Sequence, residues 1–112
     1  MNVERLSLIP QIPDDFGFDI NLFAIPRQYD GDLAKVMIPA GMIADRVEKV
    51  AVDIWQDYAG DSESELLALC VLKGGHTFFG KLKNHIATMN LFSKEALRIK
   101  EEFVRIRSYQ VC

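Results

Sequence analysis

Seven consecutive apolar residues, Leu66–Leu72, constrain the fold of this chain more than any other feature. Seven residues are too few to span a membrane, but they suit a strand that is buried on both faces, as in a parallel sheet. The run ends at Lys73-Gly74-Gly75, and apolar residues then recur with helical spacing. We therefore predict a strand, a tight turn and a helix, which is the order found in α/β folds.

The turn between these two elements has the composition of an anion-binding site. In open α/β sheets, ligands bind beyond the carboxyl ends of the strands, where this turn would lie. Gly74 and Gly75 let backbone N–H groups approach a ligand, the positive end of the next helix lies nearby, and Lys73 adds a full charge. A phosphate or pyrophosphate is the expected ligand. Ordinary strand-to-helix connections also use lysine and glycine, so the turn by itself leaves both interpretations open.

Length and charge limit the class of protein further. The 112 residues suffice for one domain with one core. The 13 basic and 16 acidic side chains give a net charge of −3, which provides no basic surface for nucleic acid or an anionic membrane. The amino-terminal sequence MNVERLSLIPQIPDDF is acidic and proline-interrupted where a secretion signal would be basic and continuously apolar. We therefore expect a soluble, cytoplasmic protein.

Flanking segments complete the expected architecture. Residues 1–35 hold three of the four prolines and show little periodicity, which predicts an irregular N-terminal arm. Residues 36–112 would form the first part of an α/β core. Within it, a helix is predicted to end near Gly60, with its apolar positions at Ile43, Val47, Val50, Ala51, Ile54, Trp55 and Tyr58.

In the C-terminal third, the spacing of apolar residues predicts one helix clearly and leaves the structure of the last segment open. Residues 76–90 carry a second helical stripe, formed by Phe78, Phe79, Leu82, Ile86 and Met89. After it, the apolar residues of ALRIKEEFVRIRSYQVC fit a charged helix about as well as a strand at residues 102–107. Periodicity leaves this choice open.

Neither the cysteines nor the acidic loop has the spacing of a metal or disulfide site. Cys70 lies within the apolar run and is expected in the core, whereas Cys112 is the last residue. In the loop Asp61-Ser62-Glu63-Ser64-Glu65 the acids alternate with serine, and they provide too few ligands for calcium. We expect no metal ligands in this chain.

Four segments, in order, resemble the hypoxanthine-guanine phosphoribosyltransferases of the purine phosphoribosyltransferase family. They are FDINLFAIPRQYDGDLAKV, VMIPAGMIADRVEKVAVDI, LLALCVLKGGHTFFGKL and FVRIRSY. The resemblance extends from about Phe18 to Tyr109 and covers only the N-terminal half of the family's pattern. It implies a partial type I phosphoribosyltransferase fold, with a parallel sheet flanked by helices and an irregular N-terminal arm.

This resemblance also implies an activity in purine salvage. The family transfers ribose 5-phosphate from phosphoribosyl pyrophosphate to a 6-oxopurine, forming IMP or GMP, and releases pyrophosphate. Magnesium neutralises the phosphates. Proteins of this family are usually homodimers or homotetramers, and nucleic acid and membranes are not expected partners.

Individual roles follow from the same resemblance. Lys73, Gly74 and Gly75 match the pyrophosphate-binding loop, in which the peptide bond before the lysine can be cis. Ser108 and Tyr109 match the start of a mobile catalytic loop. Three further positions depart from the family's usual residues: Arg107 replaces a lysine and remains a candidate charge contact, His76 replaces an aromatic residue, and Ala40 replaces a polar one.

The family's ribose 5-phosphate loop does not occur in the sequence. That loop follows two acids and is of the Asp-Thr-Gly-Lys-Thr type, but Glu101-Glu102 is not followed by it. We therefore expect the 112-residue chain to be inactive by itself, as a partial product of a transferase. In the alternative, it is a non-catalytic truncated module that pairs with a full-length subunit through its helix and sheet edge.

Overall fold

A computed structural model describes residues 11–60 and 65–107 of the chain. The chain divides into two compact units, Met1–Ala40 and Gly41–Cys112. In the described part of the first unit, β1 (Phe18–Asp19) pairs antiparallel with β2 (Lys35–Val36). Two single 3₁₀ turns, Ile20–Leu22 and Arg27–Tyr29, lie between these strands. Edge-to-face contacts link the rings of Phe16, Phe18 and Phe23.

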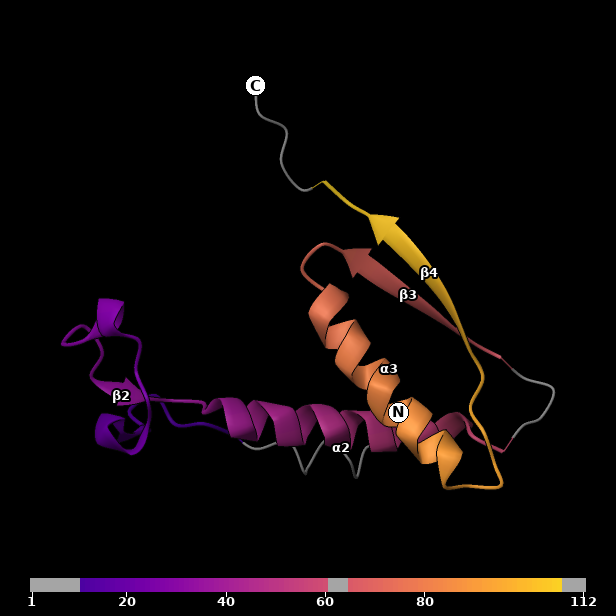
Figure 1. Ribbon diagram of the computed structural model, residues 1–112, viewed down its shortest axis with the longest axis horizontal. Helices are drawn as coiled ribbons and strands as arrows, with labels where there is room; N and C mark the ends of the chain where they lie inside the picture. Colours follow the sequence, from indigo (N-terminus) through magenta and orange to yellow (C-terminus); the bar gives the residue numbers. More distant parts are fainter. Residues whose placement is uncertain (1–10, 61–64, 108–112) are drawn as a thin grey trace. The chain divides into compact units, whose positions relative to one another are not determined.

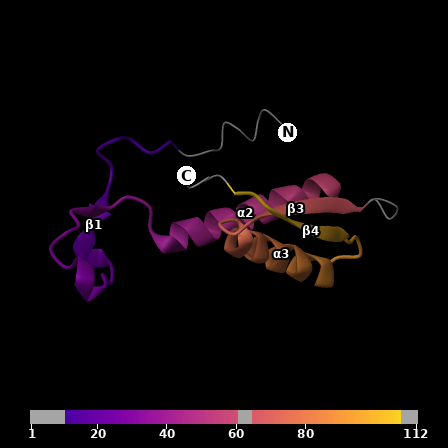
Figure 2. The ribbon, with the colours of Figure 1, turned by 90° about the horizontal axis from the view of Figure 1, so that it is seen from above.

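The second unit contains a strand–helix–strand arrangement. In order along the chain, the elements are α2 (Ala40–Tyr58, whose first residue belongs to the first unit), β3 (Leu66–Leu72), α3 (His76–Leu91) and β4 (Ile99–Arg105). Strands β3 and β4 are parallel and side by side, and α3 lies along one face of them (Figures 1 and 2). The predicted α/β class is confirmed, and the ambiguous C-terminal segment is a strand.

A small apolar core holds the helices of this unit together. It centres on Ala51 of α2, Ile86 of α3 and Leu97, which lies just before β4. Around these three buried residues pack Ile54, Trp55, Ala59, Leu66, Leu82, Met89 and Ile99. Cys70 is 3% exposed, as expected for a core residue. No helix in residues 11–60 and 65–107 combines the length and apolar character needed to cross a bilayer.

The prediction that β3 is buried on both faces is wrong. Side chains alternate along a strand, and one set in β3 faces α3. The other set, Leu67, Leu69 and Val71, is 55%, 59% and 48% exposed. α3 lies against the opposite face, and no described element fully covers this apolar one. Part of the apolar stripe predicted for α2 is also exposed, at Ile43, Val50 and Tyr58.

Asn90 ties both helices to the segment that enters β4. Its Oδ1 accepts hydrogen bonds from the Trp55 indole N–H at 2.8 Å and from the Leu97 backbone N–H at 2.9 Å. Its Nδ2 donates to the Leu97 carbonyl at 3.0 Å. All three bonds are partly buried, so water does not readily replace them. One side chain therefore holds the start of β4 against α2 and α3.

The Asn90→Ala variant should unfold more easily because it leaves these partly buried partners without hydrogen bonds. We expect its free energy of unfolding to fall by about 2 kcal/mol in urea titrations followed by circular dichroism. Asn84→Ala is the matched control, since Asn84 is an exposed residue of the same helix. It should change stability by less than about 0.5 kcal/mol. Equal effects of the two substitutions would contradict this role of Asn90.

Candidate functional site

The turn between β3 and α3, residues 73–75, lies at the carboxyl edge of the two-stranded sheet (Figure 1). The Leu72–Lys73 peptide bond is cis, as the resemblance predicts. Because β3 and β4 are parallel, both strands end at this edge. Leu72, the last residue of β3, pairs in register with Arg105, the last residue of β4. The turn is therefore flanked by the end of the neighbouring strand.

Two of the backbone N–H groups in this region are engaged within the turn. The Gly75 N–H donates to the Val71 carbonyl at 3.2 Å, and the His76 N–H donates to the Lys73 carbonyl at 3.2 Å. The N–H groups that have no acceptor among the described residues are those of Lys73, Gly74, Thr77 and Phe78. These free donors lie at the positive end of a 16-residue helix, an arrangement that favours an anion.

The two glycines of the turn differ in the atoms that surround their side-chain positions. A Cβ atom at Gly75 would lie 2.8 Å from the Val71 carbonyl oxygen, so the turn cannot close around a side chain there. A Cβ atom at Gly74 would meet no atom within 4 Å. Gly74 also has no positive φ. The fold therefore requires glycine at position 75, whereas the described structure leaves room for a side chain at position 74.

Cationic side chains gather at this edge of the sheet. Lys73 follows β3 directly, Arg105 ends β4, and Arg107 lies just beyond it; all three are exposed. None of the three forms an ion pair among the described residues. Within the described part of the chain, the edge thus combines N–H donors without acceptors and cations without ion pairs, which suits a polyanionic ligand.

The structure brings only some of the sequence-predicted site residues together. Lys73, Gly74 and Gly75 form the turn, while Ser108 and Tyr109 lie outside the described residues. The sequence analysis gave a possible charge contact to Arg107 and no role to Arg105, although the segment FVRIRSY contains both. The alternation of side chains along a strand would have indicated Arg105, had the C-terminal segment been predicted as a strand rather than left open.

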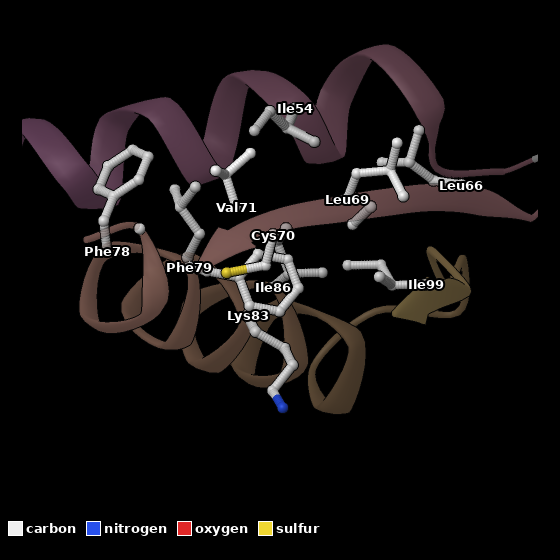
Figure 3. Close-up of a pocket in the computed structure, with 13 residues that line it drawn as sticks. Ile54, Leu66, Leu69, Cys70, Val71, Phe78, Phe79, Lys83, Ile86 and Ile99 are labelled. Atoms are coloured by element: carbon white, nitrogen blue, oxygen red, sulfur yellow. The ribbon is translucent and has the colours of Figure 1, made fainter. Parts of the chain in front are cut away.

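A cavity of about 320 Å³, which Gly75 of the turn also lines, lies between β3, α3 and Ile54 of α2 (Figure 3). Its lining is mostly apolar. Lys83 points its amine away from the cavity (Figure 3) and pairs with Glu101 at 2.9 Å. This cavity does not suit a charged sugar phosphate, so the turn is the candidate site. Among residues 11–60 and 65–107, no group of three or more His, Cys, Asp or Glu side chains is placed to hold a metal ion.

Curated proteins provide clear relatives, although no protein-family model matches this chain. The hypoxanthine-guanine phosphoribosyltransferase of Bos taurus is 43% identical over 96 residues, which are 86% of this chain and 43% of that protein. Phosphoribosyltransferase domain-containing protein 1 of Homo sapiens is 42% identical over 100 residues, or 88% of this chain and 43% of that protein. The chain therefore spans less than half the length of the curated relatives that it matches.

A solved structure shares the fold. The crystal structure of hypoxanthine-guanine phosphoribosyltransferase from Schistosoma mansoni in complex with IMP matches with a TM-score of 0.62 and 34% sequence identity. The match covers 83% of this chain and 49% of that one. Sequence and fold agree, so the predicted resemblance to hypoxanthine-guanine phosphoribosyltransferases is confirmed over the part of those proteins that this chain matches.

Proposed function

We propose that the turn between β3 and α3 binds the pyrophosphate group of phosphoribosyl pyrophosphate, as part of a purine-salvage phosphoribosyltransferase. The observation that carries this proposal is the row of backbone N–H groups at the start of α3, which have no acceptor among the described residues and follow the cationic Lys73. Gly74 lies in this row, and because no atom lies within 4 Å of its side-chain position, its backbone is open to a ligand. The similarity to hypoxanthine-guanine phosphoribosyltransferases supports the assignment of the ligand.

In this reaction, N9 of a 6-oxopurine forms a bond to C1 of the ribose while the bond from C1 to a pyrophosphate oxygen breaks, and the purine loses the proton that its N7 or N9 carried. The pyrophosphate leaves with the electron pair, so negative charge builds on it in the transition state. N–H donors and a cation that are already in place stabilise this charge more than they stabilise the bound substrate. In this chain, the free Gly74 N–H and Lys73 perform that task.

Other properties of this protein are inferred from its resemblance to the family. Magnesium accompanies phosphoribosyl pyrophosphate and is held by its phosphates, and the protein works in the cytoplasm as a homodimer or homotetramer. Ser108 and Tyr109 begin a loop that closes over the reactants and excludes water.

Gly74→Ala should weaken pyrophosphate binding because its methyl group occupies the space that a phosphate oxygen would approach. We expect the dissociation constant, measured by calorimetry on the full chain, to rise by about tenfold or more. The melting temperature should stay unchanged, since the methyl group meets no protein atom.

Gly75→Ala provides the contrast for this test. Its methyl group would lie against the Val71 carbonyl, so the melting temperature should fall in a thermal unfolding scan. The proposed function is wrong if the unmodified chain binds no pyrophosphate, or if Gly74→Ala binds it as tightly as the unmodified chain.

The 112 residues alone should produce no nucleotide from hypoxanthine and phosphoribosyl pyrophosphate. The physical reason is that the sequence contains no ribose 5-phosphate loop to hold the sugar beside the purine. A spectrophotometric assay of purified chain with magnesium measures this directly. Formation of IMP at a rate proportional to chain concentration would show that the expectation is wrong.

The second candidate function is a non-catalytic module that pairs with a full-length subunit. The open apolar face of β3, formed by Leu67, Leu69 and Val71, favours this alternative because such faces associate readily. In that case the chain should co-elute with a full-length homologous transferase in size-exclusion chromatography. Leu69→Lys should abolish co-elution, whereas Gly74→Ala should not. Separate elution of unmodified chain and transferase would exclude pairing.

A further inference from the structure

We propose that Arg105 is a second pyrophosphate contact, which acts beside Lys73 and gives the site its preference for pyrophosphate over a single phosphate. This inference rests on the function proposed above and gives a role to a residue of the matching segment FVRIRSY that the sequence analysis left without one. Three observations support it: the strand register, the order of contacts along α3, and an Arg105 guanidinium that has no partner among the described residues.

The strand register places Arg105 next to the turn. Its Cα is the partner of the Cα of Leu72, and Leu72 directly precedes Lys73. Neighbouring strands lie roughly 4.8 Å apart, a distance that an arginine side chain spans easily. The backbone of Arg105 is thus beside the start of the turn.

Contacts along β4 show in which direction Arg105 projects. Every second residue of β4 faces α3. The Glu101 carboxylate lies 2.9 Å from the Lys83 amine. Two residues further on, the centroid of the Phe103 ring lies 6.0 Å from that of Phe79 and 6.4 Å from that of His76. Each step of two residues along β4 therefore reaches an earlier part of α3. Arg105 is the next residue in this series, and the part of the chain before His76 is the turn.

The guanidinium of Arg105 is available for a ligand. The residue is exposed, and its guanidinium forms no ion pair or hydrogen bond within the described part of the chain. Glu101, on the same face of β4, is already paired with Lys83. A guanidinium donates two parallel hydrogen bonds to phosphoryl oxygens, so it can hold one phosphoryl group while Lys73 and the turn amides hold the other.

Calorimetry of the full chain with pyrophosphate and with inorganic phosphate tests this role. Arg105→Gln should weaken pyrophosphate binding by about fivefold to tenfold and phosphate binding by less than about twofold. Arg105→Lys should recover part of the lost affinity, because it keeps the charge but not the paired donors. The melting temperature of both variants should equal that of the unmodified chain.

Arg98→Gln is the matched control, since it removes the same charge from an exposed residue that directly precedes β4, at the end of the strand away from the turn. It should leave both affinities within about twofold of the original values. Unchanged pyrophosphate affinity in Arg105→Gln would overturn this inference alone, as would an equal loss in Arg98→Gln. Failure of the unmodified chain to bind pyrophosphate would overturn the proposed function together with this inference.

Discussion

The parallel pairing of β3 with β4 is the constraint on which the candidate site depends. Parallel strands need a crossover connection, and α3 provides it. Because the strands run in the same direction, both end at the edge where α3 begins. The register that pairs Leu72 with Arg105 brings together residues far apart in sequence. Asn90 supports this arrangement by anchoring the entry to β4 through Leu97.

Much of this unit could be predicted from the sequence because its signals are local. The apolar run of β3, the glycines after it and the helical stripe of α3 each specify their own element, and the structure contains all three. The pattern of β4 was ambiguous, since its charged and apolar residues suit two kinds of structure. Its conformation is determined by pairing with β3, which is a tertiary interaction that local periodicity does not express.

Features of the site that depend on neighbouring atoms could not be predicted. In the sequence, Gly74 and Gly75 look alike. In the fold, the Val71 carbonyl lies close to the side-chain position of Gly75, whereas no atom lies near that of Gly74. Which N–H groups remain free depends in the same way on the internal bonds of the turn. The role proposed for Arg105 needs the register of β4. Burial of β3 on both faces was a wrong prediction because an apolar sequence does not show which face another element covers.

A crystal structure of the chain with pyrophosphate tests the central claim most directly. We predict that one phosphoryl group lies within hydrogen-bond distance of the Gly74 N–H, beside Lys73, at the start of α3. A pyrophosphate bound elsewhere would contradict the account, for example at the hollow lined by Lys94 and Arg98 near Gly60.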